Sequence, residues 1–118
     1  MSTRIIKLNR GDSYSFELEA FLSNKPLLTT VNEAVYFAVM YPNQWFEDAI
    51  FIKGYDLSDI VDGKITIKLS PNDTRNLTPG IYYYTVKYQK GGSLETVNDL
   101  DEPEEVRTII ERTKLIIQ

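Results

Sequence analysis

The sequence predicts an all-β fold, an immunoglobulin-like β-sandwich of about seven antiparallel strands with one short helical turn. Hydrophobic residues recur at every second position along most of the chain, which is the period of a half-buried strand. Turn-forming Gly, Pro, Asn and Asp residues interrupt this pattern at short intervals. The 118 residues contain no cysteine. We therefore expect a single domain, residues 1–118, with a core that holds without disulfides.

Alternating hydrophobicity places the expected strands along the chain. Two early strands are expected over residues 5–8 and 14–20, and residues 23–32 should form a loop because Asn and Pro interrupt the pattern. Later strands are expected over residues 34–41, 48–55, 65–69, 81–90 and 106–118, with a short return strand around 94–97. Residues 104–112 also fit a helical stripe, but the β-branched content of this segment favours a strand.

Two short segments predict specific turns. Ser70-Pro71-Asn72-Asp73 should form one helical turn, with Ser70 as the N-cap and Pro71 at the first helical position. Arg10-Gly11-Asp12 is the tripeptide that cell-adhesion receptors recognise. A motif of three letters recurs by chance, so we favour a strand-to-strand turn with a left-handed glycine.

Composition argues against most kinds of chemistry. The chain has no histidine and no cysteine, so neither a Ser-His-Asp triad nor a thiolate nucleophile can form. A zinc site would need carboxylates alone, which is unusual. The net charge of −4 has mixed signs along the chain, which does not favour nucleic-acid binding. The apolar runs are too short for a membrane span, and no signal-peptide pattern opens the chain.

Carboxylates and sequons offer weaker candidates. Asp56, Asp59 and Asp62 lack the alternate spacing and the closing glutamate of a calcium loop, so a solvated connection is the better interpretation. The sequons at Asn72 and Asn76 are interpreted as chance matches. No spacing singles out a glycosidase pair of carboxylates. We therefore assign no catalytic, cofactor or metal residue and expect no enzyme.

Partner contacts have better candidates in two loops. Trp45 and Phe46 lie in an expected hairpin loop, where adjacent aromatic side chains either pack under the loop or contact a partner. Asp99, Asp101 and Glu102 belong to an acidic run over 98–105. This run could dock on a basic surface or hold a cation, and a solvated loop is the plainer interpretation.

The tyrosine-rich segment predicts a core strand. Tyr82 and Tyr84 should share a face with Val86 and Tyr88, whereas Tyr83 should point to the opposite face. A stacking surface for sugars or bases is conceivable, but core packing fits the alternation better.

Several of these segments together resemble the immunoglobulin-like domain at the N-terminus of phage baseplate upper proteins and related phage virion proteins. The shared pattern covers nearly the whole chain, and its most specific part is an Asp-Thr pair followed by Leu-x-Pro-Gly-x-Tyr. The segments that carry it are the opening strand with Arg10-Gly11-Asp12, then 34–39, 48–50, 62–69, Pro71 with Asp73 and Thr74, and 77–86. The resemblance gives turn and core roles to Gly11, Asp73, Thr74, Pro79, Gly80, Tyr82 and Tyr84.

The resemblance implies a bacteriophage virion structural or adaptor protein, made in the bacterial host cytoplasm, that docks on other virion proteins. A homo-oligomer, either a trimer or another ring, is compatible with this role. The chain departs from the family pattern in ending at Gln118 without a fibre segment and in its longer acidic stretch. Baseplate or tail adaptor, head-fibre base, connector and capsid decoration therefore stay open.

Two other functions are alternatives. A carbohydrate-binding module would use Trp45 and Phe46, with Tyr55 as a further candidate, as stacking platforms for sugars. A small glycosidase would need two carboxylates that converge in a cleft.

Overall fold

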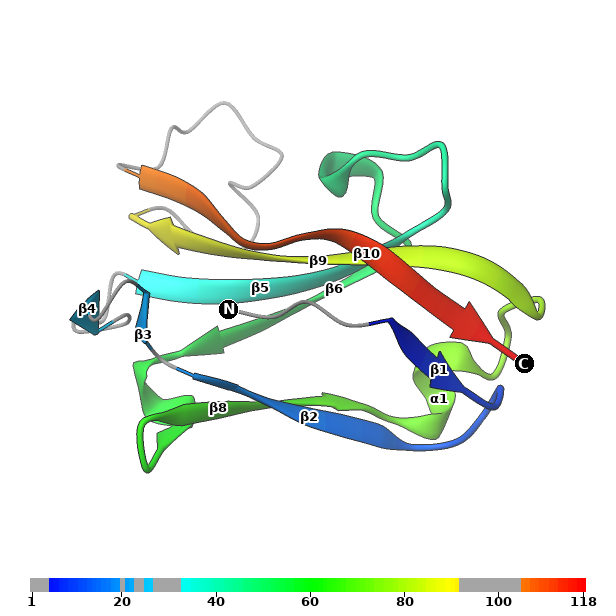
Figure 1. Ribbon diagram of the computed structural model, residues 1–118, viewed down its shortest axis with the longest axis horizontal. Helices are drawn as coiled ribbons and strands as arrows, with labels where there is room; N and C mark the ends of the chain where they lie inside the picture. Colours follow the sequence, from blue (N-terminus) through cyan, green and yellow to red (C-terminus); the bar gives the residue numbers. More distant parts are fainter. Residues whose placement is uncertain (1–4, 20, 23–24, 27–32, 92–104) are drawn as a thin grey trace.

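A computed structural model describes residues 5–19, 21–22, 25–26, 33–91 and 105–118 of the chain (Figure 1). Its strands form two facing layers. The five-stranded sheet has the order β1 (Ile6–Leu8), β10 (Glu105–Ile117), β9 (Gly80–Lys90), β5 (Glu33–Met40) and β6 (Phe51–Asp56). The three-stranded sheet has the order β2 (Tyr14–Glu19), β8 (Lys64–Leu69) and β7 (Ile60–Val61). The prediction of an all-β sandwich is confirmed.

Short elements connect these strands. A small antiparallel pair, β3 (Phe21–Leu22) and β4 (Lys25–Pro26), follows β2. The helical elements are η1 (Phe46–Asp48), η2 (Leu57–Asp59) and α1 (Pro71–Thr74). The expected loop over 23–32 is wrong at β4, since two of its residues pair with β3. The expected return strand around 94–97 lies outside the described residues.

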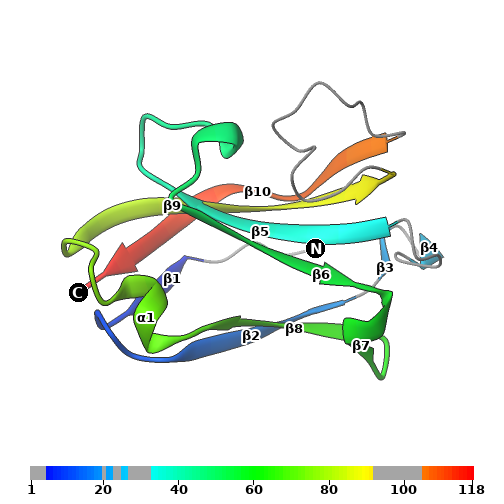
Figure 2. The same ribbon diagram turned by 180° about the vertical axis from the view of Figure 1, so that it is seen from behind.

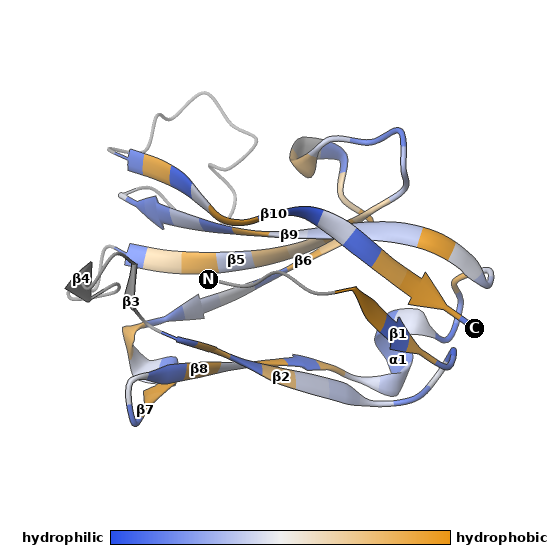
Figure 3. Ribbon diagram, viewed as in Figure 1, coloured by the Kyte–Doolittle hydropathy of each residue, from blue (hydrophilic) through white to orange (hydrophobic). Residues whose placement is uncertain are grey.

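The first and last strands pair in parallel, so the expectation of antiparallel strands throughout is wrong there. Ile6 lies opposite Leu115, and Leu8 lies opposite Ile117. After β1 the chain turns into β2, which belongs to the other sheet. β1 itself stays in the five-stranded sheet, where it pairs with the end of β10 and runs in the same direction. Figure 3 shows the hydrophobic residues of both segments side by side. The last strand is a strand and not a helix, as predicted.

Aromatic rings join the two layers in the core. Phe16 of β2 contacts Phe37 of β5 and Tyr84 of β9, with ring centroids 6.0 and 6.3 Å apart. Tyr82, Tyr84, Val86 and Tyr88 are all buried on the inner face of β9, whereas Tyr83 points outward. This confirms the predicted alternation. Burial of large apolar side chains contributes roughly 1.5–3 kcal/mol each to folding.

A turn after the first strand is fixed by the helical turn α1. Gly11 has a φ of 82°, and its N–H donates to Oγ1 of Thr74 at 2.9 Å. Thr74 is only 1% exposed, so this hydrogen bond is shielded from water. Ser70 precedes α1 as its N-cap, and its N–H donates to the Asp73 carboxylate at 2.6 Å. The predicted turn and helical turn are therefore confirmed, and they support one another.

The strand β9 begins in a tyrosine corner. Gly80 opens the strand directly after Pro79, and the Tyr82 hydroxyl donates to the carbonyl of Thr78 at 2.6 Å. Such a bond from a tyrosine to the backbone a few residues upstream is a hallmark of immunoglobulin-like sandwiches. Burial raises the pKa of Tyr82, and nearby Tyr41 adds to this effect.

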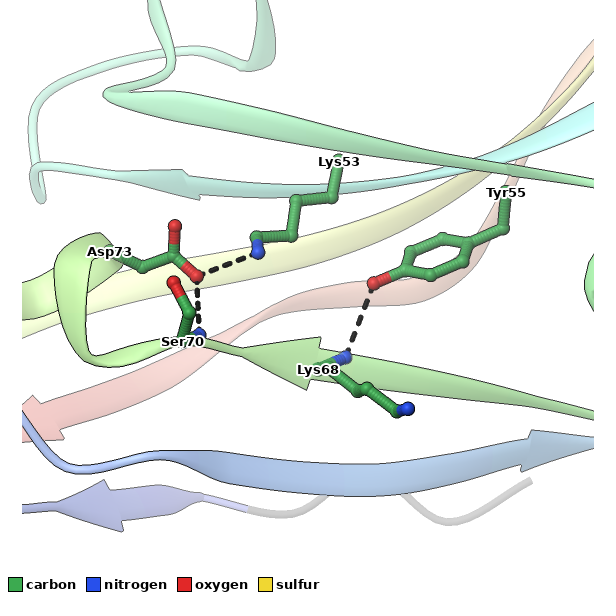
Figure 4. A network of polar contacts seen from close by, with 5 residues as sticks. All are labelled: Lys53, Tyr55, Lys68, Ser70 and Asp73. Carbon is green, nitrogen blue, oxygen red and sulfur yellow. Dashed lines mark hydrogen bonds and ion pairs between the residues drawn. The ribbon is translucent and has the colours of Figure 1, made fainter.

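The two sheets are also linked along the side where β6 faces β8. Lys53 and Tyr55 both point from β6 toward β8 and α1 (Figure 4). Lys53 Nζ lies 2.6 Å from the Asp73 carboxylate, and the Tyr55 hydroxyl accepts the N–H of Lys68 at 3.2 Å. Partial burial alone would raise the pKa of Asp73, but hydrogen bonds from Lys53 and from the Ser70 N–H outweigh it and lower this pKa.

Candidate docking surface

The loop between β5 and β6 displays the single tryptophan of the chain. Trp45 is 72% exposed, whereas its neighbour Phe46 is only 6% exposed. The loop projects from the outer side of the five-stranded sheet in both Figure 1 and Figure 2. An exposed indole of this size is unusual in a well-packed domain and marks a candidate contact for a partner.

Phe46 explains why the loop folds back on the sheet. Its ring packs against Tyr36 and Ala38 on the outer face of β5, where it forms a second small hydrophobic cluster. The Lys87 ammonium lies 4.8 Å from the centroid of the Phe46 ring, a cation–π contact.

The expected strand over 48–55 is wrong at its start, because the packing of Phe46 turns the chain before the strand begins. Residues 46–48 form the 3₁₀ turn η1, and the strand begins only at Phe51.

Arg112 of β10 fixes the same loop. Its guanidinium donates to three backbone carbonyls of the loop, those of Tyr41, Pro42 and Gln44. The bond to Tyr41 is 3.0 Å long. The guanidinium also lies 4.9 Å from the centroid of the Tyr83 ring. One planar side chain therefore holds three carbonyls in fixed positions, which a lysine could not reproduce.

Hydrogen bonds within the loop complete its order. The N–H of Gln44 donates to the carbonyl of Tyr41, and the Gln44 side-chain oxygen accepts the Tyr41 N–H, both at 3.0 Å. After the turn, the N–H of Ile50 returns to the carbonyl of Val39 at 2.7 Å. Hydrogen bonds thus hold the backbone both before and after Trp45 in the sequence.

The sequence-predicted contact residues have separate outcomes. Trp45 is exposed as a contact residue should be, whereas Phe46 is covered and supports the loop instead. Asp99, Asp101 and Glu102 lie outside the described residues. Tyr55 points toward β8, as a half-buried residue packed against the main core. Trp45, Phe46 and Tyr55 therefore form no common exposed platform for a sugar.

Sequence reasoning missed Arg112, which is the residue that orders the loop. Its three carbonyl acceptors lie 68, 70 and 71 positions before it in the sequence. The register of β9 against β10 shifts between Ile110 and Thr113, so Arg112 lies within an irregular part of the ladder. No sequence pattern marks such a long-range contact, because alternation predicts the face of a residue and not its partner.

The aspartates of the connection after β6 have local structural roles. The N–H of Asp56 donates to the Asp59 carboxylate at 2.8 Å, and Asp56 accepts the N–H of Ser58 at 2.9 Å. The hydrogen bonds from Ser58 lower the pKa of Asp56. Asp62 adopts a left-handed φ of 53° in the turn before β8. Among the residues that the structure describes, no group of three or more Asp, Glu, His or Cys side chains is placed to hold a metal.

A shallow hollow of about 430 Å³ lies at the α1 end of the three-stranded sheet. The residues that line it are Ser13, Tyr14, Ser15, Lys53, Lys68, Leu69, Ser70 and Pro71. This described lining contains no carboxylate, so the hollow does not provide the pair of acids that a glycosidase requires.

A polar cluster lies at the opposite end of the core. The Tyr88 hydroxyl donates to the carboxylate of Glu33, which is 5% exposed, and Arg107 forms an ion pair with Glu105. Burial raises the pKa of Tyr88, and its hydrogen bond to Glu33 raises it further. The Glu33 carboxylate thus accepts a hydrogen bond within the core, and Glu105 has the Arg107 guanidinium beside it.

Within the described ranges, no helix has the length and apolar character needed to cross a bilayer. Comparisons with protein-family models, with curated proteins and with solved structures find no match for this chain. The resemblance to phage virion domains therefore stays a prediction from sequence.

Proposed function

We propose that this chain is a non-enzymatic docking domain, a structural or adaptor component of a bacteriophage virion that binds other virion proteins. The phage assignment comes from the sequence resemblance, and the docking role is supported by the loop of Trp45. Under this proposal the Trp45 side chain is the anchor that enters a pocket of the partner. The chain is then located in the virion.

The observation that carries the docking role is the exposure of Trp45 on a loop that is already ordered. Arg112 holds three carbonyls of this loop, and Phe46 attaches it to the sheet. Binding through an ordered loop avoids much of the entropy that is lost when a flexible segment is immobilised. Tryptophan is also enriched among residues that dominate binding energy.

Carbohydrate binding through the Trp45 ring is the alternative function. Sugar stacking on several rings would need Phe46 or Tyr55 beside Trp45, and both have other positions in the fold. A protein pocket can enclose one isolated indole. The geometry of the loop therefore favours a protein partner over a glycan.

The virion role is tested on particles purified from the biological source of the chain. Mass spectrometry of gradient-purified particles should detect the chain in a fixed ratio to other virion proteins. Crosslinking of the same particles should connect the Trp45 loop to another virion protein. Particles without the chain would overturn the virion assignment.

The role of Trp45 is tested with Trp45→Ala in the purified protein. Light scattering over a concentration series shows whether the chain forms a trimer or another ring, and Trp45→Ala should abolish any such assembly that uses the loop. A glycan array run in parallel separates the alternatives. Glycan binding that Trp45→Ala abolishes would contradict protein docking and support the carbohydrate-binding module.

A further inference from the structure

Within the part of the chain that the structure describes, the outer edge of β2 is an unpaired strand edge of the three-stranded sheet. The sheet order is β2-β8-β7, so only one side of β2 is paired among the described residues. Figure 1 shows β2 in front of β8, and Figure 2 shows the same two strands from behind. Such an edge presents backbone groups that can pair with another strand.

The hydrogen bond of Lys68 identifies which backbone groups are available. Its N–H donates to Tyr55, on the side of β8 that faces away from β2. In an antiparallel ladder, opposite residues exchange both hydrogen bonds or none. Lys68 lies opposite Ser15, so this pair exchanges none. By alternation, the N–H and C=O groups of Ser15, Glu17 and Glu19 all face the outer edge of β2.

This edge lacks most of the features that protect strand edges. The register of β2 against β8 is unbroken from Tyr14 to Glu19, and β2 contains neither proline nor lysine. The register of β10 against β9, by contrast, shifts twice. Proline, lysine and bulges are the usual means of preventing strand addition. Along β2 as the structure describes it, the charges of Glu17 and Glu19 are what restrict the strand that can pair here.

Those charges specify the partner. Glu17 and Glu19 are exposed on the outward face of β2. Toward β8, the Glu17 carboxylate lies 3.5 Å from Lys64 Nζ. A second copy pairing through its own β2 in antiparallel orientation would place glutamates opposite or diagonal to glutamates. Like charges at these positions are destabilising, and opposite charges are stabilising. A strand with Lys or Arg at two alternate positions would complement both carboxylates.

We propose that the outer edge of β2 binds an extended basic segment of a partner protein by strand addition. Basic residues of the segment lie beside Glu17 and Glu19, and its alternate apolar residues cover the inner side next to Phe16 and Leu18, which are buried under the edge. Backbone hydrogen bonds to Ser15, Glu17 and Glu19 hold the segment in place. This site lies on the other sheet from Trp45 and goes beyond the proposed docking loop.

The test measures amide hydrogen exchange by NMR with an alternating lysine–valine peptide at about 1 mM, a concentration that also populates weak complexes. We expect exchange at Ser15, Glu17 and Glu19 to slow about tenfold, whereas Phe16 and Leu18 are already protected by β8. A peptide N-methylated at its bonding amides should have no effect. An alternating glutamate–valine peptide should also fail.

A charge-reversed variant makes the test sharper. Glu17→Lys with Glu19→Lys, both on the exposed face, should bind the glutamate–valine peptide and lose the lysine–valine peptide. Trp45→Ala should leave the peptide response unchanged, which separates this site from the docking loop. Absence of protection at the three amides would overturn the proposal, as would equal response to all peptides. Protection that rises with protein concentration alone would identify a second copy as the occupant instead.

Discussion

Replacement of Arg112 by lysine should loosen the loop that carries Trp45. The variant Arg112→Lys keeps the positive charge and most of the aliphatic stem but loses the planar fork of the guanidinium. An ammonium group can reach about one of the three carbonyls that Arg112 contacts in the loop. Two carbonyls then depend on water, and the cation–π contact with Tyr83 weakens.

The structure sets the size of this effect. A hydrogen bond from a charged donor contributes roughly 1.5–3 kcal/mol when shielded, and partly exposed pairs contribute less. Arg112 is half-buried, so the two lost bonds and the weaker ring contact should together cost about 1–2 kcal/mol. For a domain of this size, the melting temperature should fall by roughly 4–8 °C.

The assay uses Trp45, which is the only tryptophan in the chain, as its probe. Time-resolved fluorescence anisotropy should reveal faster local motion of the indole in Arg112→Lys, and denaturant unfolding should give the loss in stability. Lys114→Ala, an exposed change on the same strand, should alter neither quantity. If Arg112→Lys keeps the wild-type anisotropy decay and stability, Arg112 does not order the loop.

Two further changes test the links that hold the sandwich together. Tyr82→Phe removes the 2.6 Å bond to the Thr78 carbonyl and should cost about 1–2 kcal/mol in denaturant unfolding, whereas Tyr83→Phe should be nearly neutral. Equal stabilities of these variants would contradict the tyrosine corner. Asp73→Asn removes the ion pair with Lys53 and should cost about 1 kcal/mol near neutral pH. The folded pKa of Asp73 is lowered, so this stabilisation is complete above its unfolded pKa and disappears as the pH falls through the folded one. Unfolding curves of wild type and Asp73→Asn should therefore converge in acid, and a constant difference at all pH values would refute the ionic contribution.

Much of the fold could be predicted from alternation and turn chemistry. The strand β8 shows why, since Ile65, Ile67 and Leu69 are all buried and the residues between them are exposed. In this strand the period of two in the sequence is the period of burial in the structure. Gly11 is similar, because a left-handed turn strongly prefers glycine.

The parallel pairing of β1 with β10 could not be predicted in the same way. Residues 6–8 show which side chains face the core, but nothing in them names the strand beside them. The predicted start of β6 is wrong for a related reason. Alternation places residue 48 in the strand, whereas burial of Phe46 on Tyr36 and Ala38 makes the chain turn in η1 first. Tertiary contacts decided both cases, and local pattern contains no information on them.

The candidate site was predicted in part. The sequence singles out Trp45 because a large aromatic side chain in a polar loop has either a buried or a binding role. Which of two adjacent rings is exposed depends on the fold-back of the loop, so the sequence could not separate Trp45 from Phe46. Arg112 left no local signal, since its three acceptors are backbone carbonyls, which every residue possesses.

The two proposed contacts differ in chemistry, and salt can therefore separate them. Trp45 offers an apolar ring, and burial of apolar surface changes little with moderate ionic strength. Glu17 and Glu19 are exposed carboxylates, whose attraction to a basic strand is screened over about 8 Å at physiological salt. A partner held by the β2 edge should thus dissociate faster as salt rises, whereas one held by Trp45 should stay bound. Because the sites belong to opposite sheets, one domain could hold two partners at once. A domain that links neighbours in an assembly requires such independence, since a contact on one sheet must leave the other accessible.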